Sequence, residues 1–397
     1  MYTETIKLGS VINDIAAGPF GSNLKVSCFV DRGFPIIDGA NLKGFKVTDN
    51  ITKFVTEEKA RSLHRSIASR NDVIVTISGT LGQIAYIPYD SKYTEYLCSQ
   101  RQFRVSFNTD RVYVPYLVYY FHSREGQYKI LSFANQTGVP ALSQPLKNFK
   151  NIEINLPDIG TQKKIASVLL SIDDKIELNT AINENLEQQT YLLLEQMLST
   201  PHDDVCCLSD IANINPRYTL SKGTEARYID MSQLSTTTSF PDGWTFRAYN
   251  GGMKFRNQDT IMARITPCLE NGKTAYIDFL ADNEIAFGST EYIVLSPKEN
   301  IPPELLYCIV RHPNFRSYAT VNMNGSSGRQ RVSGEIIGKY EMPQFTEDEL
   351  AYFRSVTRPL FKQITENSLQ NRNLSALRDT LLPKLMNGEI DVSEVKF

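Results

Sequence analysis

Apolar residues recur at spacings of three and four between Gln162 and Leu198, with charged or amide side chains between them. No Gly or Pro interrupts this stretch. At about 1.5 Å per residue the helix would be roughly 55 Å long, which suits a coiled-coil spacer better than an ordinary globular helix. The apolar stripe consists of Ile165, Val168, Leu169, Ile172, Ile176, Leu186, Leu193 and Met197.

A second stretch repeats the first at an offset of 188 residues. The offset aligns Ile176 with Ile364, Asn179 with Asn367, Asn183 with Asn371, Asn185 with Asn373, Leu186 with Leu374, Leu193 with Leu381 and Leu194 with Leu382. Chance alone would give only about one or two such matches. The repeat therefore indicates a duplicated chain, although two unrelated amphipathic helices are the alternative.

Asparagines fall on or beside the apolar seam of both stretches. A buried amide costs stability unless it meets a partner, so such residues fix register and partner choice. A direct repeat folded back on itself can relate its halves by a pseudo-two-fold, so we expect antiparallel helices with Leu186 and Leu374 buried. The expected helix–helix interface comprises Ile172, Ile176, Asn179, Asn183, Leu186, Leu193, Leu360, Ile364, Asn367, Asn371, Leu374 and Leu381.

The segments outside these helices have the pattern of strand-rich domains. Short apolar runs such as Val73–Ile77 and Ile84–Ile87 are broken by Gly, Pro and Asp, and one helix is expected near Tyr116–Leu131. Glycines in the loops Gly18–Asn23 and Ser78–Gly82 allow a close backbone approach, unless these are ordinary tight turns. We expect an α+β fold with mixed, strand-rich domains at 1–158 and 200–344, long helices at 159–199 and 345–397, and an internal pseudo-two-fold repeat.

Composition narrows the class of protein. A length of 397 residues fits two or three domains, and a net charge of −2 argues against a general electrostatic binder of nucleic acid or membrane. The six cysteines lack C-x-x-C spacing and the four histidines are scattered, so we expect neither a metal site nor a disulfide framework. Without a leader-like N-terminus or a long apolar run, the chain is expected to be soluble and cytoplasmic.

No sequence motif indicates a nucleotide-binding or catalytic site. Asn271–Thr274 resembles the end of a phosphate-binding loop, but Pro267 stands where that loop needs Gly. Asn215–Tyr218 resembles the N-P-P-Y of adenine methyltransferases, but its second Pro is missing and no Gly-rich cofactor loop follows a strand. We therefore expect no catalytic residues and no cofactor.

Polar side chains suited to reading bases concentrate in loops of both strand-rich domains. Arg pairs with guanine edges, Asn and Gln pair with adenine, and Ser or Thr pairs with phosphate or base. Singly, each such residue is more often a solvated loop residue. The candidates for DNA binding are Ser22, Lys25, Thr80, Gln100, Arg101, Gln102, Arg104, Gln136, Thr137, Ser143, Gln144, Lys147, Arg264, Lys273, Ser289, Thr290, Asn324, Ser326, Arg329 and Arg331.

The whole arrangement resembles the specificity subunit of a type I restriction-modification system. The resemblance rests on the alternation of variable domains with long helices, and on the stretches Gly18–Ser22, Asn155–Pro157, Ile182–Glu187 and Leu381–Glu389. It implies two target recognition domains that each read one half of a bipartite site in double-stranded DNA. It also implies two antiparallel helices that act as a spacer and dock two modification subunits, with restriction subunits joining through the complex.

The resemblance implies no catalysis by this chain. Thr161–Lys164 departs from the Pro-led, Gln-rich helix start of many relatives, and the second helix opens more loosely around Phe345–Glu349. Two alternatives remain at this point. One is a methyltransferase with an undetected cofactor site, which would bind S-adenosylmethionine; the other is a coiled-coil scaffold that binds proteins and reads no DNA sequence.

Overall fold

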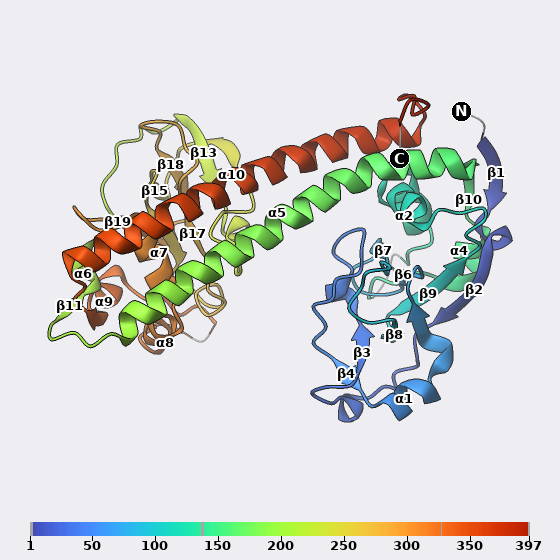
Figure 1. Ribbon diagram of the computed structural model, residues 1–397, viewed down its shortest axis with the longest axis horizontal. Coiled ribbons are helices and arrows are strands. Elements are labelled where there is room, and N and C mark those ends of the chain that lie inside the picture. The colour runs from blue at the N-terminus through green and yellow to red at the C-terminus, as the bar shows by residue number, and fades with distance from the viewer. Residues whose placement is uncertain (1–2, 136–138, 327, 396–397) are drawn as a thin grey trace. The chain divides into compact units, whose positions relative to one another are not determined.

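The protein divides by its internal contacts into two units. The computed structural model describes residues 3–135, 139–326 and 328–395. The first unit comprises Met1–Asp173 with Ser375–Phe397, and the second comprises Asp174–Leu374. Helices α5 (Ile159–Ser199) and α10 (Glu347–Met386) each contribute residues to both units (Figure 1). The first unit is therefore assembled from two separate segments of the chain.

Three sheets form the strand-rich part of the first unit, within the described residues. An antiparallel sheet has the order β2 (Ile12–Ala17), β9 (Gln102–Phe107), β6 (Val73–Thr76) and β7 (Ile84–Tyr86). A mixed sheet has the order β4 (Phe54–Val55), β3 (Phe34–Ile37), β8 (Glu95–Cys98) and β5 (Ile67–Ser69), with β3 parallel to β8. β1 (Thr3–Lys7) pairs with β10 (Glu153–Pro157). The helices are α1 (Glu57–Ser62), α2 (Val114–His122), α3 (Arg124–Leu131) and α4 (Pro145–Asn151).

The second unit repeats the three sheets of this plan strand by strand. Its antiparallel sheet has the order β12 (Ala212–Ile214), β19 (Tyr292–Pro297), β16 (Thr260–Ala263) and β17 (Thr274–Tyr276). Its mixed sheet has the order β14 (Thr245–Ala248), β13 (Glu225–Ile229), β18 (Ala286–Gly288) and β15 (Met253–Phe255), with β13 parallel to β18. β11 (Val205–Cys207) pairs with β20 (Glu341–Pro343). The helices are α6 (Leu208–Ile211), α7 (Pro303–Arg311), α8 (Pro313–Val321) and α9 (Gly334–Gly338).

The matching sheet orders confirm the duplication expected from the sequence and the α+β class. The single helix expected over Tyr116–Leu131 was wrong in one respect, because the chain breaks it into α2 and α3 at Ser123. Ser123 has extended backbone angles, and its hydroxyl accepts a hydrogen bond from the Gly126 N–H at 3.2 Å. A serine in this position starts a new helix instead of continuing the old one.

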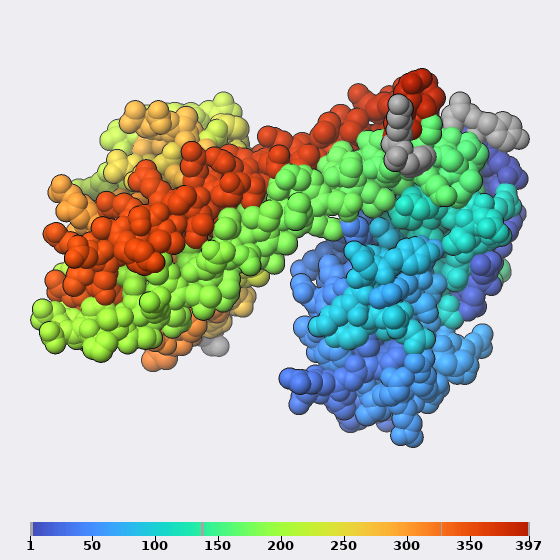
Figure 2. All heavy atoms as spheres, in the orientation of Figure 1, coloured from blue at the N-terminus to red at the C-terminus, as the bar shows by residue number. Residues whose placement is uncertain are grey.

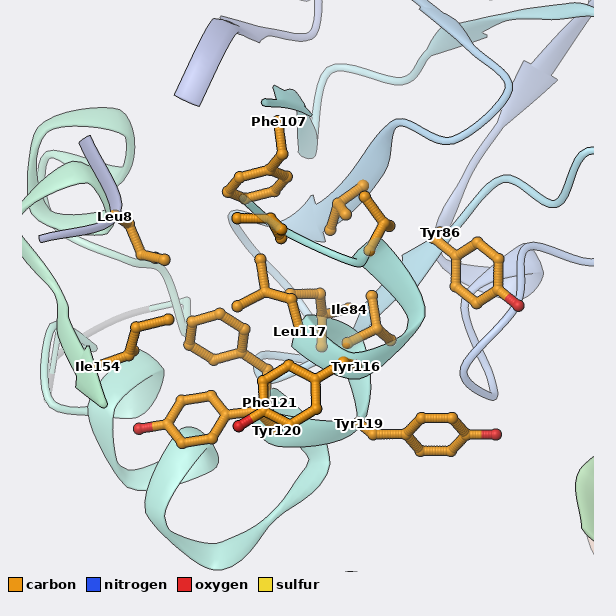
Figure 3. Packing of buried hydrophobic residues seen from close by; sticks show 14 of the residues in the cluster. Leu8, Ile84, Tyr86, Phe107, Tyr116, Leu117, Tyr119, Tyr120, Phe121 and Ile154 are labelled. Carbon is orange, nitrogen blue, oxygen red and sulfur yellow. The ribbon is translucent and has the colours of Figure 1, made fainter. Parts of the chain in front are cut away.

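Helix α2 supplies the centre of the first unit's core. Its residues Leu117 and Phe121 lie one turn apart and are fully buried with Ile84 and Ile154 (Figure 3). Leu382 and Leu385 of α10 and Val392 beyond it belong to the same core. Helix α10 ends at Met386, so the segment expected to be helical up to 397 instead leaves the helix and packs into the core through Val392.

The two long helices pack antiparallel in both units. In the second unit Asn179 Nδ2 donates to Asn371 Oδ1 at 2.8 Å, and Asn367 Nδ2 donates to Asn183 Oδ1 at 2.8 Å. In the first unit Asp173 pairs with Arg378 at 2.9 Å. The residue number rises along α5 as it falls along α10, which is the antiparallel direction.

Two expected seam positions were wrong. Leu186 and Leu374 are half-buried, not buried. Glu187 occupies the buried position next to Leu186 because its carboxylate accepts hydrogen bonds from the Ser239 N–H at 2.6 Å and hydroxyl at 2.7 Å. In a pair of helices, each residue of the apolar seam is also covered by the partner helix on one side only. Leu374 is therefore only partly shielded from solvent.

The remaining expected interface residues fall into two classes. Ile172, Asn179, Asn183, Ile364 and Asn367 are buried. Half-buried positions are Ile176, Leu193, Leu360, Asn371 and Leu381. Among the described residues, no helix is long and apolar enough to cross a membrane.

Candidate nucleic-acid interface

Three loops of the first unit meet where β6 ends and β9 begins. The Ile77 N–H donates to the Arg101 carbonyl at 2.7 Å, the Leu142 N–H donates to the Ile77 carbonyl at 2.8 Å, and the Gly79 N–H donates to the Pro140 carbonyl at 3.0 Å. These bonds join the loop after β6, the turn between β8 and β9, and the loop after α3. The structure thus brings together the described parts of three loops that the sequence singled out separately.

The loop Gly18–Asn23 closes against the same turn. The Gly18 N–H donates to the Gln102 carbonyl at 2.7 Å, and a Cβ atom on Gly18 would lie 1.8 Å from the Ser99 carbonyl oxygen. Only glycine permits that approach. The close approach expected from the glycines is therefore made between two loops of the protein itself.

Arg101 occupies the centre of this loop cluster. Hollows of about 600 and 690 Å³ flank it, and Ser78, Gln100 and Arg101 line both. Within the described residues the Arg101 guanidinium makes no ion pair, and the side chain is exposed. Also exposed are Ser22, Lys25, Thr80, Gln100, Ser143, Gln144 and Lys147.

Two candidates in the first domain were wrong because the fold uses their side chains. Gln102 is 1% exposed and its amide lies against the Ser99 hydroxyl, so it has no access to a base edge. Arg104 donates to Asp14 at 2.5 Å and to the Arg65 carbonyl at 3.0 Å, and it lies 3.9 Å from Asp72. Gln136 and Thr137 lie outside the described residues.

The second unit builds the same cluster with other side chains. The Arg264 N–H donates to the Glu291 carbonyl at 3.0 Å, the Val332 N–H donates to the Arg264 carbonyl at 3.0 Å, and the Thr266 N–H donates to the Gln330 carbonyl at 3.1 Å. By these bonds Arg264 is equivalent to Ile77, Glu291 to Arg101 and Val332 to Leu142. The backbone frame is shared while the side chains differ.

Some candidates in the second domain are engaged by other residues of the protein, whereas others are exposed. The Lys273 ammonium donates to the Met231 carbonyl at 2.8 Å, and the Ser289 hydroxyl accepts from the Glu291 N–H at 3.1 Å. Arg331 forms an ion pair with Glu291 at 2.7 Å, and this hydrogen-bonded partner holds the Glu291 pKa below its usual range. Arg264 is half-buried, and Thr290, Asn324, Ser326 and Arg329 are exposed.

Sequence reasoning missed two apolar residues at the cluster. Phe20 and Val26 are 82% and 81% exposed, and they line the two hollows beside Arg101. Phe20 stands between Pro19 and Gly21, outside any strand or helix. An aromatic residue in such a loop was the signal available in the sequence. Among the described residues, no group of three His, Cys, Asp or Glu side chains is placed to hold a metal ion.

Comparison with known proteins finds similarity to restriction-enzyme specificity subunits. A family model for the type I restriction modification DNA specificity domain matches residues 26–188. The chain is 21% identical over 392 residues to the type I restriction enzyme HindI specificity subunit of Haemophilus influenzae, covering 78% of this chain and 84% of that protein. It is 24% identical over 379 residues to the MjaIX specificity subunit of Methanocaldococcus jannaschii, covering 86% and 82%.

A solved structure agrees at the level of the fold. The type I restriction-modification system S subunit from M. genitalium aligns with a TM-score of 0.60 at 15% identity, covering 97% of this chain and 96% of that one. The match includes both strand-rich domains and both long helices, because so little of either chain is left unaligned. Over most of its length the chain is similar to the specificity subunits of type I restriction-modification systems.

Proposed function

We propose that the chain reads a bipartite sequence in double-stranded DNA, with one half-sequence read by the domain at 1–158 and the other by the domain at 200–344. The observation that carries the proposal is the shared loop cluster. Both domains hold three loops at the same strand ends by equivalent backbone hydrogen bonds, yet Arg101 in one corresponds to Glu291 in the other. A common frame with different side chains suits two readers of unrelated sequences.

The long helices serve as the spacer and as the docking surface for modification subunits, through which restriction subunits join the complex. Leu178 and Ile182 support this role, because they lie one turn apart on α5 and are 54% and 37% exposed. In Figure 2 the outer sides of α5 and α10 are uncovered over the second unit. Leu178→Glu combined with Ile182→Glu should reduce co-purification of the modification subunits, and unchanged co-purification would contradict the docking role.

Catalysis belongs to the partners, and the chain supplies recognition. Its net charge of −2 gives no overall attraction to the phosphate backbone, so we expect tight binding to need subunits that add phosphate contacts. We expect affinity for the target duplex to rise, and its salt dependence to steepen, when modification subunits are added. Equal affinity and an equal salt slope in both cases would contradict this division of labour.

Methylation-site sequencing of the assembled complex tests the proposal directly. The expected target is two unrelated short sequences separated by a fixed number of unread base pairs. A protein-binding scaffold would instead leave methylation independent of sequence, and random DNA would then compete as well as the target.

A further inference from the structure

The Arg331 guanidinium is held in one orientation by hydrogen bonds. Its Nε donates to the two Glu291 carboxylate oxygens at 3.0 and 2.9 Å, and its Nη2 donates to Oε1 at 2.7 Å. Its Nη1 donates to the Arg329 carbonyl at 3.1 Å. Contacts on three nitrogens leave the plane of the guanidinium little freedom to rotate.

The backbone beneath this side chain is also fixed. Arg331 and Asn324 exchange both of their backbone hydrogen bonds at 2.9 Å, and Arg331 forms a second bridge with Ile265. Glu291 is tied in the same way, because its N–H donates to the Ser289 hydroxyl at 3.1 Å and its carbonyl accepts from the Arg264 N–H at 3.0 Å. The pair is therefore positioned from both ends before any ligand arrives.

A count of donors shows what this orientation leaves available. A guanidinium carries five N–H groups. Glu291 and Arg329 engage one on each nitrogen, so one N–H on Nη1 and one on Nη2 remain. The Arg331 side chain is 39% exposed. Two adjacent donors from one arginine match the O6 and N7 acceptors of guanine in the major groove.

The fold itself does not require this ion pair. At the equivalent positions in the first domain, equivalent backbone hydrogen bonds and the bridge between Ser78 and Ala141 place Arg101 where Glu291 lies and Ala141 where Arg331 lies. Arg101 and Ala141 cannot form an ion pair, yet the three loops meet there in the same way. The backbone frame of the loop cluster therefore forms without an ion pair at these two positions, which leaves the Glu291–Arg331 pair free to serve recognition.

We propose that Arg331 reads a guanine in the half-sequence recognised by the second domain, with Glu291 as the positioning residue that orients it. The inference rests on the proposed function and deepens it by naming one base and the side chain that reads it.

Methylation-site sequencing of complexes assembled with variant chains tests the inference. Arg331→Ala should make one G·C position of the second half-sequence degenerate, with discrimination at that position falling roughly 5- to 150-fold. Arg331→Lys should lose discrimination at the same position, because an ammonium does not reproduce the planar pair of donors. Glu291→Gln should keep the guanine but lower the methylated fraction of sites, since it removes the charge that orients Arg331.

The first half-sequence and the spacer should stay unchanged in all three variants. This unchanged part of the target serves as the internal control that the variant chain is folded and assembled. Lys339→Ala is the matched control, because it breaks another exposed ion pair of the second domain, with Glu335 at 2.8 Å, outside the loop cluster. If Arg331→Ala prevents assembly, Arg331→Lys and Glu291→Gln decide by the same criterion. The inference is overturned if the variants methylate the same target sequence as the parent, with unchanged discrimination at every position. A parent complex without sequence preference would instead overturn the proposed function.

Discussion

A buried aspartate lies at equivalent positions in the two domains, but its partners differ between them. Asp72 and Asp259 occupy equivalent turns, in which the Ser69 and Arg256 N–H groups donate to their carboxylates at 2.9 Å. Asp72 has Arg104 at 3.9 Å, whereas Asp259 accepts from the Tyr218 hydroxyl at 3.0 Å. Burial raises the pKa of both carboxyl groups, and it raises that of Asp259 to about 6.

This raised pKa predicts a dependence of stability on pH. Between the unfolded value of 3.8 and the folded value of about 6, the folded chain holds a proton that the unfolded chain releases. Stability from this group is therefore present at low pH and lost as pH rises through 6, by about 1 kcal/mol between pH 5 and 7. Asp259→Asn should remove that slope in thermal unfolding, and parallel pH profiles for variant and parent would contradict the prediction. Asp72→Asn is the matched comparison and should change the slope less, because Arg104 at 3.9 Å opposes the rise that burial causes in the Asp72 pKa.

At the residue scale, the sequence predicted which types of side chain occur in the loops. It did not predict which of them stay exposed and which the fold engages in ion pairs. Arg101 and Arg104 look alike in the sequence, but one is exposed at a loop tip and the other is neutralised by Asp14 from β2. That partner lies 90 positions away and becomes visible only when β2 pairs with β9. The equivalence of Arg101 and Glu291 likewise emerges from backbone hydrogen bonds and not from any motif.

At the scale of elements the long helices were predictable because their periodicity is local. The start of α10 also had a signal, since Thr346 and Glu349 form a capping box in which the Thr346 N–H donates to Glu349 at 2.8 Å and the Glu349 N–H donates to Thr346 at 3.2 Å. The seam was less predictable. Glu187 takes a buried position because its hydrogen-bond partner, Ser239, comes from the second domain.

The Asn183–Asn367 pair predicts a non-additive response to substitution. Both residues are buried, at 5% and 7% exposure. Asn367→Leu should destabilise the chain by about 1–3 kcal/mol, because it leaves the Asn183 amide buried without its donor. Adding Asn183→Leu should restore much of that loss, since two apolar groups then face each other. Urea unfolding of both single variants and the double variant measures the coupling, and strictly additive losses would show that the amides do not act as a pair.

At the scale of the whole molecule the helices should act as the ruler of the DNA target. Inserting four residues between Asp173 and Asn179 would add about 6 Å of helix and a little over one turn. At about 3.4 Å per base pair, the unread spacer should lengthen by one or two pairs while both half-sequences stay the same. Exchanging residues 1–150 for those of a relative should change one half-sequence and keep the spacer. Methylation-site sequencing distinguishes these outcomes, and an insertion that altered the half-sequences but not the spacer would show that the ruler lies elsewhere.

The first unit's two-segment construction has a consequence for protein synthesis. Leu382, Leu385 and Val392 fill the same core as Leu8 and Leu169. At 5–20 residues per second, the ribosome needs roughly 10–40 seconds after making Asp173 before these residues emerge. Ribosome-bound chains stopped at Leu374 should therefore be cleaved by protease within the N-terminal domain, and full-length chains should resist. A nonsense mutation late in the gene would then damage the domain encoded at its beginning.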